Sequence, residues 1–202
     1  MKTNFFLLFA TVSFFACGSK LETIEVKNDA GILTERYTQD LQTELRQGKS
    51  NLYFEDGTVQ EESNYDKGVL EGERKLYYEN GSLQAIERYD KGTFAGTYQA
   101  YYENDTLELE GQYINGVMSG DWKRYYKSGK LMEVVAFVNN EENGPFIEYY
   151  ENGKTKAEGT YKDGDNEHGE LKLYDETGEL ERTMTCVMGR CQTVWQKEEK
   201  EI

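Results

Sequence analysis

The pentapeptide YYENG occupies residues 77–81 and recurs letter for letter at residues 149–153. Its glycine position belongs to a series with steps of 24 to 26 residues, namely Gly31, Gly57, Gly81, Asp105, Gly129, Gly153 and Gly178. Two further glycine series, starting at Gly48 and Gly68, keep nearly the same spacing. Self-similarity at such a period is the signature of a repeat array. The chain is therefore predicted to contain about seven units of about 24 residues.

Each unit is predicted to be a pair of short strands joined by tight turns. Asn-Gly at residues 80–81 and 152–153 is typical of a two-residue type I′ hairpin turn, in which both central residues have positive φ. A glycine interrupts the chain about every twelve residues, and no segment sustains a helical apolar stripe. Hydrophobic residues make up only 37% of the chain, and 16 tyrosines supply much of its apolar surface. This composition favours an all-β fold: an elongated, single-layer, twisted antiparallel meander of β-hairpins.

A two-residue turn at residues 80–81 would fix the register of the flanking strands. The pairs that it predicts in this hairpin are Tyr78–Leu83, Leu76–Ala85 and Arg74–Glu87. Later hairpins give Tyr98–Gly111, Trp122–Val135, Arg124–Glu133 and Phe146–Gly159, with Trp195 at the position of Trp122 in the last unit. Aromatic rings over glycines and opposite charges are favourable cross-strand neighbours. This face of the sheet is predicted to be the apolar one.

The opposite face is predicted to carry the first tyrosine of each pair. We call this row the tyrosine ladder; it consists of Tyr53, Tyr77, Tyr101, Tyr125, Tyr149 and Tyr174. The predicted cross-strand partners of its members are mostly polar, namely Gln84, Glu108, Met132 and Lys156. Tyrosine offers a large contact area at low entropic cost. The ladder is therefore a candidate binding surface, and stabilisation of a thin sheet is its alternative role.

The pattern YYENGxLxxxxxYxxGxxxG resembles the MORN repeat (membrane occupation and recognition nexus), in the longer variant found in bacterial exported and antitoxin-like proteins. The resemblance covers residues 29–195, our predicted repeat domain, and leaves residues 196–202 as a charged tail. It implies an elongated ribbon of consecutive hairpins. It also implies a scaffold that rarely performs chemistry itself.

The N-terminus predicts export and lipid attachment. A basic start is followed by twelve apolar or small residues at positions 5–16, which is too short to cross a membrane but typical of a secretory signal. Residues 15–19, FACGS, resemble a bacterial lipobox, with Phe14 as its departure from the pattern. We expect residues 1–16 to be a signal peptide and Cys17 to be lipidated, with residues 17–28 as a tether. The alternative is an ordinary signal peptide.

The remaining two cysteines, Cys186 and Cys191, flank the turn of the last hairpin. In an exported protein an even residual number of cysteines indicates a disulfide, and free thiols are the alternative. The single histidine, His168, lies in an acidic turn, which is a poor place for a catalytic base. Asp163, Asp165, Glu167 and Glu170 crowd the same turn without the ligand spacing of an EF-hand. No metal, cofactor or catalytic residue is predicted.

The net charge of −15 opposes binding to phosphate backbones, so nucleic acid is not an expected partner. Our hypothesis is a non-enzymatic, membrane-anchored scaffold that binds a protein or peptide at the bacterial cell envelope, on its periplasmic or cell-surface side. The first alternative is an antitoxin or immunity protein that neutralises a basic toxin through charge complementarity. The second is a surface protein that binds glycans or lipids.

Overall fold

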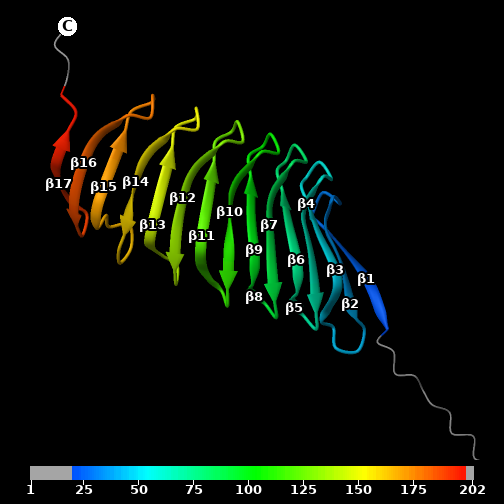
Figure 1. The fold of residues 1–202 in the computed structure, drawn as a ribbon. Coiled ribbons are helices and arrows are strands. Elements are labelled where there is room, and N and C mark those ends of the chain that lie inside the picture. Colours follow the sequence, from blue (N-terminus) through cyan, green and yellow to red (C-terminus); the bar gives the residue numbers. More distant parts are fainter. Residues whose placement is uncertain (1–19, 199–202) are drawn as a thin grey trace, which may run out of the picture.

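The computed structural model describes residues 20–198, so the predicted signal peptide and Cys17 lie outside the described residues. The described residues form one antiparallel sheet of 17 strands. Successive strands pair with one another, except that two two-residue strands, Val69–Leu70 and Thr93–Phe94, pair with the strand before them. The strands on either side of each short strand also pair with each other. Figure 1 shows the resulting elongated row of hairpins from β1 (Leu21–Lys27) to β17 (Arg190–Gln196). The predicted all-β meander is confirmed. The described part contains no helix long and apolar enough to cross a membrane.

The strands follow one another with short connections. Their bounds are β1 Leu21–Lys27, β2 Leu33–Asp40, β3 Arg46–Tyr53, β4 Val59–Asp66, β5 Val69–Leu70, β6 Gly72–Tyr77, β7 Leu83–Asp90, β8 Thr93–Phe94, β9 Gly96–Tyr101, β10 Leu107–Ile114, β11 Val117–Tyr125, β12 Leu131–Val138, β13 Glu141–Tyr149, β14 Thr155–Tyr161, β15 Gly169–Tyr174, β16 Leu180–Val187 and β17 Arg190–Gln196. β1 lies inside residues 17–28, so the sheet begins before the predicted repeat domain.

The loop at YYENG differs from the predicted type I′ turn. Gly81 donates its backbone N–H to the carbonyl of Tyr78 at 2.9 Å, and Tyr78 donates to the carbonyl of Ser82 at 2.9 Å. Only Gly81, at φ 83°, has positive φ; Asn80 does not. This is a three-residue loop closed by a glycine bulge. Asn80 stabilises the loop through its side chain instead, because its Oδ1 accepts a hydrogen bond from the backbone N–H of Ser82 at 2.8 Å.

The type I′ conformation occurs at the other end of the hairpins. Lys67 and Gly68 have φ of 49° and 81°, and Lys91 and Gly92 have 47° and 78°. Positive φ at both central residues matches the right-handed twist of the flanking strands. The two ends of each hairpin therefore use two different loop types. The signal at Asn-Gly was correctly read as a hairpin, but its turn type was wrong.

The register agrees with prediction along most of each strand and slips next to the YYENG loop. Leu76 pairs with Ala85 and Arg74 with Glu87, as predicted. The predicted Tyr98–Gly111, Trp122–Val135, Arg124–Glu133 and Phe146–Gly159 pairs are also confirmed. Leu83, however, faces Tyr77 and not Tyr78, because the ladder shifts by one residue between Leu76 and Tyr77. The bulge leaves Gln84 without a cross-strand partner.

The buried residues lie on one face of the sheet, which we call the inner face. Trp122 is 4% exposed and Phe146 is 3% exposed. A Cβ atom at Gly111 would lie 2.1 Å from the Trp122 ring, so only glycine leaves room for the indole. Phe146 covers Gly159 in the same way, at 2.8 Å. The predicted apolar face is thus the inner face of the C-terminal repeats.

Candidate binding surface

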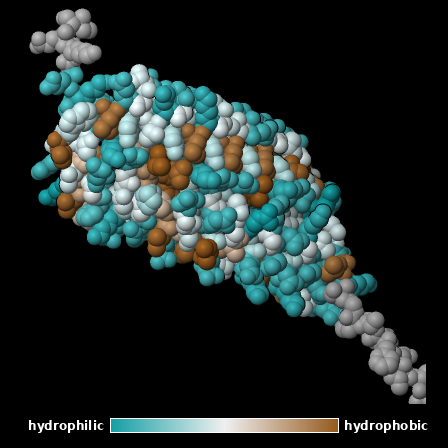
Figure 2. Space-filling model, viewed as in Figure 1, coloured by the Kyte–Doolittle hydropathy of each residue, from teal (hydrophilic) through white to brown (hydrophobic). Residues whose placement is uncertain are grey.

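The tyrosine ladder lies on the opposite, outer face. Regular alternation along β6 places Leu76 on the inner face and Tyr77 on the outer, and the same holds for Ala100 and Tyr101 on β9. All six ladder tyrosines are half-buried. Their bodies therefore pack on the sheet while part of each ring remains accessible to a ligand. Figure 2 shows hydrophobic residues in a row that crosses the hairpins.

The floor between the ladder tyrosines is more apolar than predicted. The bulge beside each loop makes Leu83 the partner of Tyr77, Leu107 that of Tyr101, and Leu131 that of Tyr125. Val59, Thr155 and Leu180 pair with the other three ladder tyrosines. The predicted partners Gln84, Glu108, Met132 and Lys156 are therefore wrong. A one-residue slip exchanges the faces on which side chains lie, so the ladder alternates tyrosine with a mainly aliphatic residue.

The hydroxyl groups of the ladder alternate between two environments. Tyr77 donates to Glu62 at 2.9 Å, and Tyr125 donates to Glu110 at 2.8 Å. Tyr174 repeats the arrangement with Glu158 at 2.8 Å. Partial burial, followed by the hydrogen bond to Glu62, raises the pKa of Tyr77 to about 12. These hydroxyls are held protonated on the sheet and are poor general bases.

Tyr101 and Tyr149, the ladder tyrosines that lie between Tyr77, Tyr125 and Tyr174, have no carboxylate that accepts their hydroxyl. The positions equivalent to Glu62 and Glu110 are Ile86, beside Tyr101, and Val134, beside Tyr149. Among the described residues, neither Tyr101 nor Tyr149 donates its hydroxyl to another side chain or backbone carbonyl. The outer face thus has a 48-residue alternation superimposed on the 24-residue repeat. The hydroxyls of Tyr101 and Tyr149 are available to a ligand.

The second tyrosine of each pair joins consecutive repeats. Tyr78 donates its hydroxyl to the backbone carbonyl of Tyr101 at 2.8 Å, and Tyr126 donates to that of Tyr149 at 2.7 Å. Tyr102 and Tyr150 make the same bond to Tyr125 and Tyr174. Each bond fixes the loop of one repeat on the next strand pair. The first and second tyrosines therefore have different roles, and only the first remains a recognition candidate.

The inner face of the N-terminal repeats is charged rather than apolar. Arg74 lies between two buried carboxylates, at 2.5 Å from Glu61 and 3.0 Å from Glu87. Tyr89 adds a 3.0 Å hydrogen bond to Glu87. The hydrogen bond to Glu61 raises the pKa of Arg74 above its usual value. We call Glu61, Arg74 and Glu87 the ion triad; it leaves no group free for catalysis within it.

Two hollows on the inner face lie between neighbouring loops. One, of about 530 Å³, is lined by Leu52, Phe54, Arg74, Tyr78 and other side chains. The other, of about 240 Å³, contains Arg124, Glu133, Glu148 and Lys156. Its charges are matched, since Lys156 lies 2.6 Å from Glu148. Burial raises the pKa of Glu133 despite the nearby Arg124.

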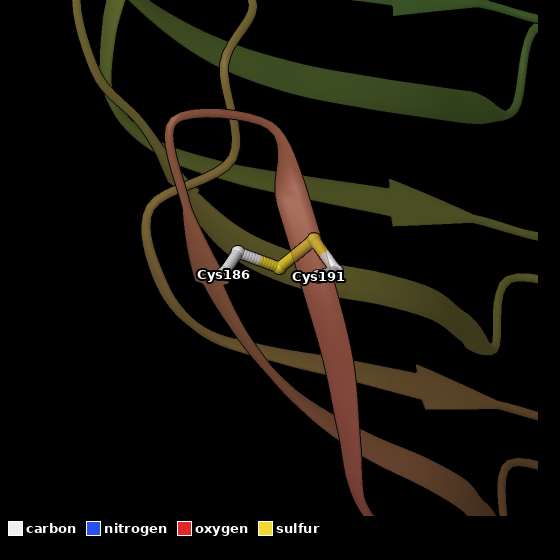
Figure 3. The surroundings of a disulfide bond; sticks show 2 residues. All are labelled: Cys186 and Cys191. Atoms are coloured by element: carbon white, nitrogen blue, oxygen red, sulfur yellow. A yellow bond between two sulfur atoms is a disulfide. The ribbon is translucent and has the colours of Figure 1, made fainter.

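The last repeat holds the remaining predicted residues. Cys186 and Cys191 are cross-strand partners on β16 and β17, and their sulfur atoms are joined (Figure 3). His168 is half-buried, and its Nδ1 has no hydrogen-bond partner in the described residues. No group of three metal-binding side chains converges within residues 20–198. Trp195 is 46% exposed, unlike Trp122.

A comparison with protein-family models identifies the repeats. The model described as the MORN repeat variant matches residues 46–67, 70–91, 95–115, 118–139, 142–163 and 167–185, which is more than half of the chain. The chain belongs to the MORN repeat variant family. The resemblance inferred from the sequence is thereby confirmed, and the protein is a MORN repeat scaffold. A search of curated proteins found no match.

Proposed function

We propose that this MORN repeat protein is a non-enzymatic, lipid-anchored scaffold that binds a protein or peptide partner at the bacterial cell envelope through its outer face. The observation that supports this most is the tyrosine ladder. It supplies one half-buried ring per repeat, above an aliphatic floor, on a sheet whose backbone is fixed by pairing. Rigid aromatic anchors of this kind are the residues that dominate binding energy at protein interfaces.

The proposed anchor sets where this surface would lie. Cys17 is only three residues before Lys20, the first described residue, and β1 begins at Leu21. Two or three acyl chains on Cys17 would hold the protein stably, because each buried CH₂ contributes about 0.8 kcal/mol. Neighbouring strands lie about 4.8 Å apart, so the array would extend roughly 65 Å along the sheet from this anchor. The ladder would then be presented at a range of distances from the membrane.

The test is affinity purification of the anchored protein after chemical crosslinking in cells. We expect a defined partner with the native chain and its loss with a Tyr77→Ser/Tyr101→Ser/Tyr149→Ser variant. A matched control is Thr97→Ala/Gln112→Ala, which removes a 2.9 Å hydrogen bond elsewhere on the outer face. Equal capture by all three forms would contradict the proposal. In parallel, Cys17→Ser should move the protein from the membrane to the soluble fraction.

The acidic charge also supports the second candidate, neutralisation of a basic toxin. Loss of residues 1–16 would remove one lysine and no acid, which makes the net charge one unit more negative than −15. A strong field of this sign accelerates the capture of a cationic partner. Coexpression with toxins encoded nearby would test it: rescue of growth supports the antitoxin role. Failure to rescue from any of them would contradict the antitoxin role.

A further inference from the structure

The spacing of the tyrosine ladder matches the period of one protein conformation. Two strands per repeat, each about 4.8 Å from its neighbour, place successive ladder tyrosines about 9.6 Å apart. A polyproline II helix has three residues per turn and a rise of about 3.1 Å per residue, which gives about 9.3 Å per turn. A segment in this conformation, lying across the strands, would meet one tyrosine per turn. A β-strand, with its two-residue period, would not.

The ladder also has the form of a series of slots. Val59 pairs with Tyr53 and Leu83 pairs with Tyr77, and the strands that carry Val59 and Leu83 pair on their other sides with the strands of Tyr77 and Tyr101. A ligand side chain that enters between two ladder tyrosines would then meet an aromatic ring on either side and an aliphatic residue beneath it. Aromatic-lined slots of this kind accept the side chains of proline-rich segments. The same pair of a ladder tyrosine and a leucine recurs in successive repeats.

The hydrogen-bonding groups fit the same ligand. The backbone of the sheet interior is occupied by strand pairing, so an extended ligand on this face cannot add a strand. Polyproline II needs no such pairing, and its carbonyl groups have no internal hydrogen bonds. The hydroxyl of Tyr101, which donates to no other described residue, is available to one of those carbonyls. Tyr77 retains its bond to Glu62.

The loops beside the first three ladder positions are acidic. Residues 54–58, 78–82 and 102–106 contain Glu55, Asp56, Glu79, Glu103 and Asp105 and no basic residue. The next two loops differ: residues 126–130 carry Lys127 and Lys130, and residues 150–154 carry Lys154. The same tyrosine row thus has an acidic border at its first three positions, a mixed or basic border at Tyr125 and Tyr149, and an acidic border again at Tyr174, where Lys197 lies 3.5 Å from Asp175. The first three positions are the longest run of ladder tyrosines whose border complements a cationic ligand.

We propose that Tyr53, Tyr77 and Tyr101 bind a proline-rich, basic segment of the partner in the polyproline II conformation, with one turn per repeat. Its apolar side chains enter the slots, and its Lys or Arg side chains face the acidic loops. This rests on the proposed function, since it names the chemistry of the partner that the ladder binds. Tyr125 and Tyr149 do not bind this segment, because lysines lie on their border, and Tyr174 is a single acidic position with no acidic neighbour in the row.

The test uses the full-length chain in detergent micelles and a fluorescein-labelled twelve-residue peptide. The peptide has Leu at every third position, Pro between them and Arg at both ends. We expect saturable binding by fluorescence anisotropy. Two peptides of closely related composition serve as controls, one with Leu at every fourth position and one with Gly in place of Pro. Both should bind about tenfold more weakly, through lost register and lost preorganisation respectively.

Variants locate the site. Tyr101→Ser should weaken binding about tenfold, as expected of an interface anchor, whereas Tyr149→Ser, its counterpart beyond the acidic border, should change it less than about twofold. Glu79→Gln/Glu103→Gln should weaken binding at low salt and reduce its salt dependence. Unchanged thermal unfolding midpoints show that the variants fold. Tyr101→Phe, which keeps the ring, should show a smaller loss than Tyr101→Ser.

Three results would overturn the inference: no binding, equal binding of all three peptides, or equal losses for Tyr101→Ser and Tyr149→Ser. Such a failure is distinguishable from failure of the proposed function. If the peptide does not bind but the ladder variant still loses its cellular partner, the scaffold function stands and the proline-rich ligand is wrong. If the ladder variant keeps its partner, the outer face is not the binding surface at all.

Discussion

The N-terminal and C-terminal repeats share one backbone but differ in what their inner faces contain. Residues 46–91 bury two serines and the two carboxylates of the ion triad, whereas residues 118–185 bury Trp122, Val135, Phe146, Ala157 and Leu171. The loops, bulges and register are nevertheless alike in both halves. The hydrogen bonds that the second tyrosines donate to the next repeat, which we call clasps, also occur in both halves, at Tyr78 and at Tyr126. The loops and the inter-repeat hydrogen bonds therefore determine the geometry of the array. The residues of the inner face determine whether a repeat is stabilised by ion pairs or by apolar packing.

The largest effect is expected in the apolar half. Trp122→Ala should lower the free energy of unfolding by about 3 to 5 kcal/mol, because it opens a cavity above Gly111 that the sheet cannot fill. Urea denaturation followed by circular dichroism measures it. Trp195→Ala is the matched control and should cost less than about 0.5 kcal/mol, since Trp195 is largely exposed. Similar losses for both tryptophans would contradict the comparison.

The charged half should respond differently to single and joint changes. Arg74→Met leaves Glu61 and Glu87 without their cation, and we expect a loss of about 2 to 3 kcal/mol, less than for a fully buried pair because Arg74 is partly exposed. The joint variant Glu61→Leu/Arg74→Met/Glu87→Leu should recover most of this or exceed the native stability. If the joint variant is less stable than Arg74→Met, the triad is more than a substitute for apolar packing.

The two disulfide cysteines belong to the apolar half alone. Cys186→Ser/Cys191→Ser should cost about 2 kcal/mol, the entropic contribution expected for so short a loop. The loss should be confined to β15–β17, the end of the array. Hydrogen exchange with mass spectrometry locates it. Faster exchange throughout residues 46–91 would show that the halves are coupled more tightly than the shared backbone suggests.

A clasp should contribute modestly in either half. Tyr126→Phe removes the 2.7 Å hydrogen bond to the carbonyl of Tyr149 and should cost about 1 kcal/mol. Tyr78→Phe should cost about the same, since its bond is equivalent. The control is Tyr149→Phe, whose hydroxyl has no partner among the described residues. The thermal unfolding midpoints rank the three variants. A loss of stability for only one of Tyr78→Phe and Tyr126→Phe would show that the two halves do not share the same inter-repeat stabilisation.

Alkaline pH should weaken both halves through the ladder. Burial and a neighbouring glutamate raise the pKa of Tyr77 and Tyr125 to about 12, compared with about 10 in an unfolded chain. The folded chain then holds more protons between pH 10 and 12. Its stability is therefore complete below pH 10 and falls as the pH rises to 12. Tyr77→Phe/Tyr125→Phe should flatten this decline in denaturation midpoints; an unchanged slope would rule out these groups.

The fold was predictable because the same sequence pattern recurs in every repeat. Cross-strand pairs such as Trp122–Val135 and Phe146–Gly159 were correct since alternation along a strand leaves only two choices of face. The partners of the ladder tyrosines were not predictable from that alternation. Asn-Gly fits two loop types, and the longer one shifts the strand by one residue. That shift replaced the expected Gln84 with Leu83 beneath Tyr77 and made the ladder apolar.

Two further features depended on neighbours that a repeat alignment does not reveal. Trp195 occupies the repeat position of Trp122 but is exposed, because Met184 takes the position of Gly111 and the strand pairs differently there. The ion triad joins residues of three strands, and only its Arg74–Glu87 pair followed from the hairpin register. Register within a hairpin is a local property. Contacts between successive hairpins are not.

The central claim is that the outer face binds the partner, and two tyrosines on opposite faces of β9 test it most directly. Tyr101 lies on the outer face, whereas Tyr98 lies on the inner face beside Trp122, with ring centroids 5.8 Å apart. A photoreactive benzoylphenylalanine at either position replaces one aromatic side chain with another. Irradiation of the anchored protein in cells should crosslink the partner from position 101 and not from position 98. Crosslinking from position 98 alone would place the partner on the inner face and contradict the account.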